Sequence, residues 1–500
     1  MSVARAAAHG VAWNMLFGIS SRLLTLISTL VLTRFVAPEA YGAVLAASIS
    51  VVTFGVLTSF AFGQYLIAKK ATPDVAFQAA VLHTGVGIVA MTVLFVFREP
   101  IGRLLETPEM SDFVLYYAIA HIIDRARYVP ERLIMRELRF RTLATINGAG
   151  ELAYVAAALS LAPRYAEDAI VVAVLVRAVV TSALYFGAVP RREWLVVSPL
   201  RAEVVRSLFG YGLPIMIAAA ADRAATRWDN FIMSKLFGPA AMGRYNLAYS
   251  LAETPISHVA EHIGEVLMPS FSKMEEAERR PAVVKAAALM ALIVSPLGVG
   301  LGAVSPTLVD AMFNEKWAGI APMLAVLSIM TLFRPMTWSA VAYLQAVQKT
   351  RLVMWASFTR AILVLPLVAL FGWQGGPTWA CVGATIGYAV HSIGTIVATG
   401  RVTPLPVGPY LTGVLRPLLA CLPMFGVVAG IEIAFDQLGV HPVASLLVQV
   451  VAGGAVYVAS ALVLVRSSAL ELIRLGKGAI RRRASRAPTP AGPDSTDGSV

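Results

Sequence analysis

The sequence predicts an all-α integral membrane protein with about 14 transmembrane helices. Apolar residues make up 58% of the chain and charged residues only 14%, whereas soluble domains have about 45–50% and about 25%. Apolar runs of about 20 residues, enough for a helix to cross a hydrocarbon core of about 30 Å, recur along the chain. A segment near residue 38 also returns near residue 239, which indicates a duplicated half.

The predicted spans follow one another with short connections. Their bounds are 9–33, 42–68, 75–97, 112–135, 142–162, 169–189, 208–233, 243–268, 282–304, 319–344, 352–371, 378–399, 411–434 and 442–465. The first run lacks a small-residue cleavage pattern, so we interpret it as a retained span rather than a signal peptide. Beyond Arg466 a basic stretch leads into a tail rich in Pro, Gly and Ser, for which we expect a short juxtamembrane helix and then disorder.

Lys and Arg accumulate in alternate loops, and this orients the spans. Lys69 and Lys70 lie in one such loop, and Arg136, Arg139 and Arg141 lie in another. Because Lys and Arg mark cytoplasmic loops, both termini are predicted to face the cytoplasm, and we expect a bacterial inner membrane. The net charge of +12 then reflects topology and attraction to anionic lipid headgroups, so nucleic acid is not an expected partner.

The duplicated segment predicts two similar lobes. RFVAPEAYG at 34–42 returns as KLFGPAAMG at 235–243, with the proline and the last glycine in the same register. Two halves of six spans each have the same orientation, so a pseudo-twofold axis should lie along the membrane normal, with a central cavity between the lobes. The predicted divisions are 1–207 for helices 1–6, 208–400 for helices 7–12, 401–466 for helices 13 and 14, and 467–500 for a basic, disordered cytoplasmic tail.

Eight arginines fall inside the predicted spans and are the candidate substrate-binding residues. They are Arg22, Arg125, Arg127, Arg177, Arg223, Arg227, Arg334 and Arg360. A charge at the bilayer centre costs about 2.5–3.5 kcal/mol even on the lenient insertion scale, so each must face a partner or water. The repeat aligns Arg22 with Arg223. For Arg125 and Arg127, an ion pair with Asp124 or Glu131 is as compatible with the sequence as ligand contact.

The arginines outnumber the acids in their own helical turns, which predicts a cationic cavity. Such a cavity suits an anion, and guanidinium groups match phosphate oxygens in geometry. Glu253, Glu261 and Glu265 recur at four-residue intervals or multiples of them, and so lie on one face of a predicted helix. Together with Asp124 they are candidates for coupling to H⁺ or Na⁺, or else they neutralise nearby arginines.

No enzyme site emerges from the motifs. HVAEH at 258–262 matches a zinc-peptidase pattern, but no third ligand is evident, so neither metal binding nor catalytic residues are predicted. Cys381 and Cys421 lie in predicted spans and indicate neither a disulfide framework nor a cysteine metal site. The chain also has no Gly-rich phosphate loop, and short loops leave no room for a soluble catalytic domain. A transporter without a resident cofactor is therefore expected.

Several diffuse motifs resemble those of the Wzx-type polysaccharide flippases. The resemblance covers about residues 9–465 and rests on RFVAPEAYGAVLAA, KLFGPAAMGRYNLAYSLAE, RELRFRTLATI, FGYGLPIM and FNEKWAGIAPMLAVLSI. Their superfamily of multidrug, oligosaccharidyl-lipid and polysaccharide exporters has a two-lobed bundle of twelve or fourteen helices. The resemblance implies export of undecaprenyl-pyrophosphate-linked repeat units to the periplasmic leaflet by alternating access, for capsule, O-antigen (lipopolysaccharide) or exopolysaccharide. It also implies membrane lipid, a polysaccharide polymerase and a chain-length regulator as partners.

Two related functions stay open. A lipid II flippase also handles an undecaprenyl diphosphate, and the sequence separates it poorly from a polysaccharide flippase. A multidrug or cation antiporter would favour an acidic cavity, opposite to the arginine excess. Aromatic and amide residues in the spans are candidates for contact with sugar rings, although interfacial aromatic belts explain such residues too. They are Trp13, Asn14, Tyr154, Tyr211, Trp228, Asn230 and Trp338.

Overall fold

The structure is a computed structural model that describes residues 24, 27–69, 72–137, 139–472 and 474. Side chains are described except at 68, 225, 258–266, 268–269, 335 and 350. Most of the predicted span 9–33 and the tail after residue 474 therefore lie outside the described residues. The described part of the chain is built of helices and contains no strand, which confirms the all-α class.

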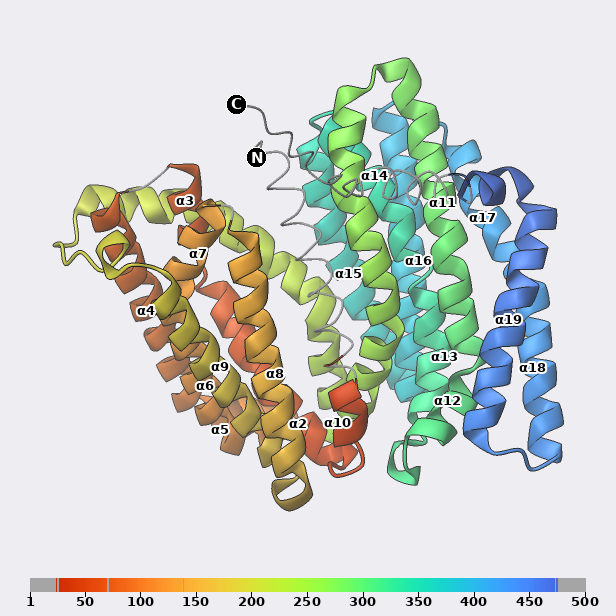
Figure 1. The fold of residues 1–500 in the computed structure, drawn as a ribbon, viewed down its shortest axis with the longest axis horizontal. Helices are drawn as coiled ribbons and strands as arrows, with labels where there is room; N and C mark the ends of the chain where they lie inside the picture. The colour runs from red at the N-terminus through yellow and green to blue at the C-terminus, as the bar shows by residue number, and fades with distance from the viewer. Residues whose placement is uncertain (1–23, 25–26, 70–71, 138, 473, 475–500) are drawn as a thin grey trace, which may run out of the picture.

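The helices form two groups that are connected by α10 (Figure 1). The N-terminal group comprises α2 (Pro38–Leu57), α3 (Phe62–Ala68), α4 (Pro73–Val96), α5 (Arg98–Leu104), α6 (Met110–Ala126), α7 (Tyr128–Arg136), α8 (Phe140–Tyr165) and α9 (Asp168–Ala188). A short 3-10 turn, η1 (Arg191–Glu193), leads to α10 (Ala202–Lys273). The C-terminal group comprises α11 (Glu276–Ala303), α12 (Ser305–Met312), η2 (Glu315–Trp317), α13 (Ile320–Met330), α14 (Arg334–Ala346), α15 (Thr350–Gly375), α16 (Pro377–Val402), α17 (Val407–Leu419), α18 (Cys421–Gln437) and α19 (Pro442–Leu464).

Nine helices in the described part are long and apolar enough to cross a membrane. The total of about 14 stays a prediction, because most of the span 9–33 lies outside the described residues. Two predicted spans are divided. The span at 112–135 breaks at Arg127 into α6 and α7, and the span at 319–344 breaks between α13 and α14. Proline explains both breaks, because α7 has Pro130 in its first turn and α14 carries a proline at its start.

The predicted division between spans 208–233 and 243–268 coincides with a break inside α10. At Gly238 the backbone leaves helical geometry, with φ 77° and ψ 179°, so α10 consists of two helices that meet at this residue. A positive φ is strained for any residue with a Cβ, so glycine permits the chain to reverse its course without a loop. Figure 1 shows the first part of α10 crossing from the N-terminal group and the second part rising within the C-terminal group.

The two copies of the repeated segment touch each other. A Cβ placed on Gly42 would lie 1.9 Å from the carbonyl oxygen of Pro239, and a Cβ on Gly243 would lie 2.5 Å from that of Pro38. Such reciprocal contacts are those of a local twofold relation. Small residues at a helix crossing let two backbones approach closely. Glycine in both copies is therefore what allows α2 and α10 to cross here.

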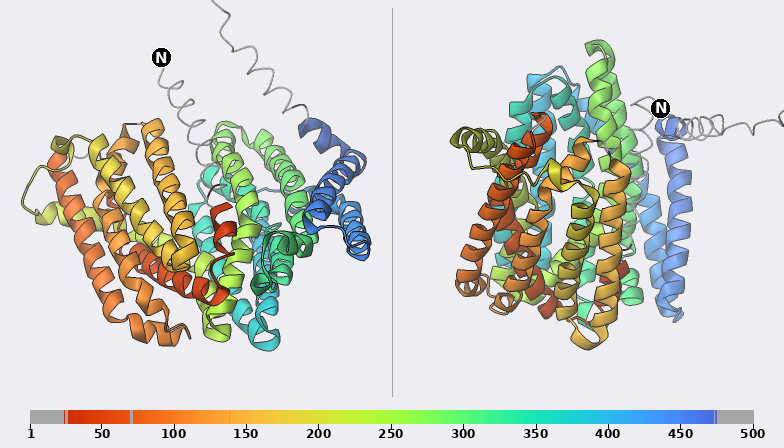
Figure 2. Two further views of the ribbon diagram at one scale, coloured as in Figure 1. Left: turned by 60° about the horizontal axis from the view of Figure 1, so that its bottom comes forward. Right: turned by 60° about the vertical axis from the view of Figure 1, so that its left-hand side comes forward.

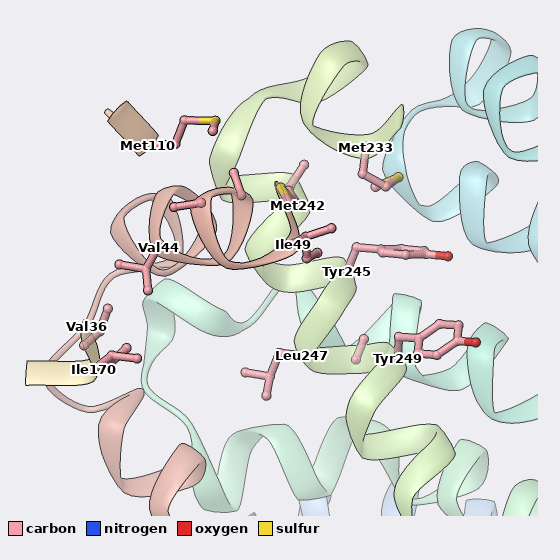
Figure 3. Packing of buried hydrophobic residues seen from close by; sticks show 14 of the residues in the cluster. Val36, Val44, Ile49, Met110, Ile170, Met233, Met242, Tyr245, Leu247 and Tyr249 are labelled. Carbon is pink, nitrogen blue, oxygen red and sulfur yellow. The ribbon is translucent and has the colours of Figure 1, made fainter. Parts of the chain in front are cut away.

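Further contacts around this crossing join the two helix groups at one end of the molecule. The segments that meet there are residues 33–42, 105–107, 234–243 and 314–317. Trp317 is fully buried and donates from Nε1 to the Thr33 carbonyl at 3.0 Å. Lys235 pairs with Glu106 at 2.7 Å. Figure 3 shows the apolar packing beside the crossing, with side chains of α2 facing those of α10. All four segments lie in or next to loops predicted to be periplasmic, and we call this region the joined end.

The last helices pack on the outside of the C-terminal group. Both views in Figure 2 show α18 and α19 at the edge of the molecule. They pack mainly on each other and on α11 and α12. Tyr457 of α19 anchors this hairpin, because its hydroxyl donates to the Leu292 carbonyl of α11 at 2.6 Å.

Candidate functional site

Arg125 is bound entirely by protein groups. Its side chain is 4% exposed. It donates to the carbonyls of Gly55 at 2.5 Å, His83 at 3.1 Å and Thr58 at 3.2 Å, to the Thr58 hydroxyl at 2.8 Å, and to Nε2 of His121 at 3.0 Å. These five bonds use every guanidinium donor, so none is left for a ligand. These contacts favour a structural role for Arg125, whose side chain connects the end of α2 to α4 and α6.

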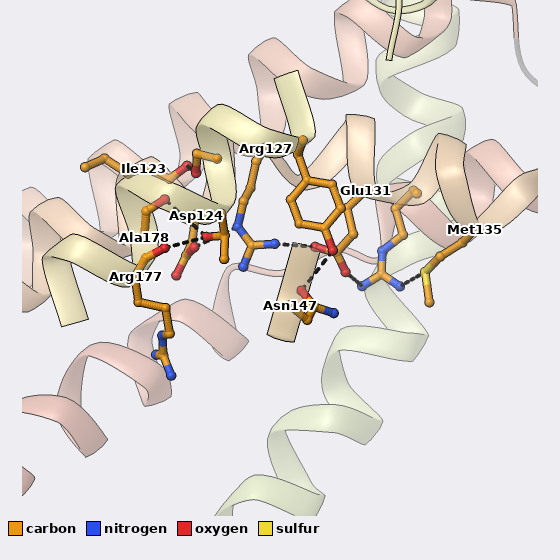
Figure 4. A network of polar contacts seen from close by, with 12 residues as sticks. Ile123, Asp124, Arg127, Glu131, Met135, Asn147, Arg177 and Ala178 are labelled. Carbon is orange, nitrogen blue, oxygen red and sulfur yellow. Dashed lines mark hydrogen bonds and ion pairs between the residues drawn. The ribbon is translucent and has the colours of Figure 1, made fainter. Parts of the chain in front are cut away.

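Arg127 forms the local ion pairs that the sequence allowed. Its Nε donates to Asp124 at 2.8 Å and a terminal nitrogen donates to Glu131 at 2.9 Å (Figure 4). The guanidinium also lies 5.0 Å from the centre of the Tyr185 ring. Two carboxylates and an aromatic face satisfy this charge within the protein.

Two arginines of the C-terminal group pair with acids on α10. Arg334, at the start of α14, pairs with Glu253 and lies 5.9 Å from the centre of the Tyr388 ring. Arg360 of α15 pairs with Asp222 at 2.5 Å. Both acids are distant from their partners in the sequence. These pairs connect the second half of α10 to α14 and its first half to α15.

Arg223 and Arg227 differ from the other described candidates. They lie one turn apart on the first half of α10, and both are half-buried. Neither forms an ion pair with the described residues. Asp222 is engaged by Arg360, and the buried Asp229 accepts hydrogen bonds from the Tyr245 hydroxyl at 2.7 Å and from Asn230. These two arginines therefore form a cationic pair, the charge pattern that suits an anion.

A pocket of about 280 Å³ with a mixed polar and apolar lining lies within the N-terminal group, between α2, α6, α8, α9 and the residues at 29–32 that precede α2. We call it the tyrosine pocket. Its polar lining residues include Tyr41, Ser48, Tyr117, His121, Asp124, Tyr154 and Arg177. Figure 4 shows Asp124 and Arg177 in the network beside it. Arg177 pairs with Glu151 at 3.7 Å and lies 5.5 Å from the centre of the Tyr154 ring.

Only part of this pocket was predicted from the sequence. Asp124, Arg177 and Tyr154 were candidates, but Tyr41 and Tyr117 were not. Tyr117 lies one turn before His121 and two turns before Asp124, so helical spacing on α6 carried a signal for it. Tyr41 carried no comparable signal, since it stands at the start of an apolar helix in which Ser48 is the nearest polar lining residue.

Five candidate residues cannot be placed. Trp13, Asn14 and Arg22 lie outside the described residues, as do the side chains of Glu261 and Glu265. The side chains of the HVAEH motif lie outside them as well. Elsewhere, the described residues contain no cluster of three His, Cys, Asp or Glu that could hold a metal ion. Glu253 and Asp124 are both described, and each is engaged in an ion pair with an arginine.

Known proteins resemble this chain in sequence and in fold. The model of a family described as polysaccharide biosynthesis protein matches residues 31–322. The lipopolysaccharide biosynthesis protein WzxC of Escherichia coli K12 is 24% identical over 80% of this chain and 81% of its own length. The succinoglycan biosynthesis transport protein ExoT of Rhizobium meliloti is 26% identical over 98% of each. A solved structure of the lipid II flippase MurJ, inward closed, has a TM-score of 0.73 at 14% identity, covering 91% of this chain and 99% of MurJ.

Proposed function

Since this chain belongs to the family of polysaccharide biosynthesis proteins, we propose that it moves undecaprenyl-pyrophosphate-linked repeat units from the cytoplasmic to the periplasmic leaflet of a bacterial inner membrane. The predicted resemblance to Wzx-type flippases is confirmed at the level of the family. The chain is a multi-pass membrane transporter and not an enzyme, as predicted from its sequence. The MurJ likeness, at 14% identity, concerns the fold alone.

The observation that carries the proposal is the cationic pair Arg223 and Arg227. A diphosphate and its sugars are too polar to cross hydrocarbon unaided, because buried charge without partners is strongly disfavoured. Guanidinium groups one turn apart offer several donors to the oxygens of one diphosphate. Most other described candidate arginines are already paired, so this pair is the best-supported headgroup site. Arg22, which the repeat aligns with Arg223, is proposed to contribute to it.

The arrangement of the two groups supports a direction for transport. The helix groups meet at the joined end, whose segments lie in or next to loops predicted to be periplasmic. With both termini cytoplasmic, this state would receive its substrate from the cytoplasmic side. An inside-negative membrane potential then favours release of an anion outward, by about 2.3 kcal/mol per charge per 100 mV. Rocking of the lobes about this end would complete the alternating access.

We also propose that the return of the empty carrier is coupled to H⁺ or Na⁺ through Glu253, Glu261, Glu265 and Asp124. Protonation of Glu253 would remove its attraction to Arg334 and so loosen the contact between α10 and α14. Transport into liposomes with and without ionophores tests this coupling. An unchanged rate on collapse of both gradients would remove it. Contacts with a polymerase and a chain-length regulator are further proposals, testable by co-purification.

The decisive experiment is complementation of a bacterial strain that lacks this gene. We expect loss of surface polysaccharide, with lipid-linked repeat units retained on the cytoplasmic face. Wild type should restore export, Arg223→Gln with Arg227→Gln should not, and lysine at both positions should restore it in part. Arg401→Gln, at an exposed position at the end of α16, is the matched control.

Other outcomes would redirect the assignment. Lethality with accumulated lipid II would indicate the lipid II flippase alternative. Normal polysaccharide with altered drug sensitivity would indicate a multidrug or cation antiporter. Export that survives loss of both arginines would refute their role and leave the transporter class intact.

A further inference from the structure

The tyrosine pocket has the chemistry of a saccharide site. We propose that it holds one uncharged sugar ring, the one attached directly to the diphosphate of the lipid-linked substrate. This inference rests on the proposed function, and it adds a residue-level basis for discrimination among substrates. A pocket rich in hydroxyl groups inside a membrane protein needs polar partners, because buried polar groups are nearly always hydrogen-bonded.

The charges of the pocket cancel locally, which argues against an ionic ligand. Arg177 pairs with Glu151 at 3.7 Å. Asp124 pairs with Arg127 at 2.8 Å. Each charged group at the pocket wall therefore already has a partner of opposite sign. Neither a diphosphate nor a metal cation would find an uncompensated charge here, whereas a neutral polar ligand would keep both pairs intact.

The pocket still offers both donors and acceptors. Nε2 of His121 accepts from Arg125 at 3.0 Å, so the ring is neutral and its proton is on Nδ1, which can donate. Arg127 donates a hydrogen bond to Oδ1 of Asp124. Among the described residues no hydrogen bond reaches Oδ2, so this oxygen can accept one from a ligand. A sugar hydroxyl donates once and accepts up to twice, so adjacent hydroxyls need this mixture of groups.

Three aromatic side chains complete the pattern. Tyr41, Tyr117 and Tyr154 come from α2, α6 and α8, and all three line the pocket. A tyrosine presents an apolar ring face to carbon-bound hydrogens and a hydroxyl to polar atoms. A volume of about 280 Å³ is at the small end of ligand pockets, which begin at about 300 Å³. It suits a single ring and excludes a whole repeat unit.

Tyr41 connects the pocket to the cationic pair. It lines the pocket and stands on α2, which packs against α10, the helix that carries Arg227. The first sugar of the substrate is bonded to the diphosphate. A diphosphate held by Arg223 and Arg227 would therefore bring that sugar, and not a later one, to the side of the pocket where Tyr41 lies.

The test uses the full-length protein in lipid nanodiscs and two probes, undecaprenyl pyrophosphate and undecaprenyl pyrophosphate carrying one hexose. We expect wild type to bind the hexose-bearing probe more tightly than the bare one. Tyr117→Phe with Tyr154→Phe should weaken binding of the hexose-bearing probe by about tenfold, the equivalent of one or two lost hydrogen bonds. The same variant should bind the bare probe as wild type does.

The controls separate this inference from the proposed function. Tyr457→Phe removes a buried hydroxyl in α19, far from the pocket, and should leave the binding of both probes unchanged. Arg223→Gln with Arg227→Gln should weaken both probes equally. Equal wild-type affinity for the two probes, or equal weakening of both by the tyrosine variant, would overturn the sugar site and leave the diphosphate site standing. Failure of wild type to bind either probe would overturn the proposed function itself.

Discussion

Substitution at the glycine crossing tests the packing of α2 against α10 in the most direct way. In Gly42→Ala the new methyl carbon would lie 1.9 Å from the Pro239 oxygen and 2.6 Å from its carbonyl carbon. The obstructing atoms belong to the backbone, so no side chain can rotate away and the helices must separate. Overpacking of this kind costs typically about 1–3 kcal/mol. In Gly243→Ala the closest approach is 2.5 Å, so we expect a smaller loss of stability from the same mechanism.

The two substitutions should not be additive. Once one alanine has separated the helices, the second meets less obstruction, so the double variant should lose less stability than the sum of the single losses. Unfolding by SDS titration in mixed micelles measures the three values. Gly85→Ala is the matched control, since a Cβ there meets no atom within 4 Å, and it should be neutral or stabilising by about 0.5–1 kcal/mol. Strict additivity, or a Gly42→Ala effect no larger than the control, would refute the close crossing.

Three more substitutions test the polar contacts. Arg125→Leu should strongly reduce the yield of folded protein in gel filtration, because several buried carbonyls each lose a hydrogen-bond donor, at a cost of about 1–3 kcal/mol per carbonyl. Arg125→Lys should retain part of the wild-type yield. Glu253→Gln should lower the thermal stability by leaving Arg334 without its carboxylate, and adding Arg334→Gln should recover some of the loss if the two groups are paired. Trp317→Phe removes a buried donor at the joined end and should lower the unfolding free energy by about 0.5–1.5 kcal/mol, and an unchanged value would show that this bond is dispensable.

The class of the fold could be predicted because composition and the length of apolar runs are properties of the sequence alone. The repeated segment likewise indicated the duplication, and the contact between its two copies at Gly42 and Gly243 became visible only in the structure. Helix breaks were harder to predict. The break at Gly238 falls inside the predicted loop between spans 208–233 and 243–268, whereas the breaks at Arg127 and between α13 and α14 lie inside predicted spans, because apolar periodicity alone does not mark an interruption.

The site was predictable as a set of residues and not as a set of contacts. Arginine in an apolar span is visible in the sequence because of its solvation cost. Its partner is visible only when it lies within a turn or two, as Asp124 does for Arg127. Arg334 and Glu253 are 81 positions apart, so only the packed fold brings them together. The tyrosine pocket depends on four helices at once, and pairwise spacing reveals only one wall of it.

The pairing of Glu253 with Arg334 has a consequence for the order in which the chain is made. A ribosome delivers the second half of α10 to the membrane well before α14 has been synthesised. During that interval the carboxylate is within the bilayer region without the cation that later neutralises it. Assembly of this part of the protein therefore becomes complete only when the later helix arrives. A chain truncated between the two residues would keep an unmatched acid in the membrane, which is energetically costly.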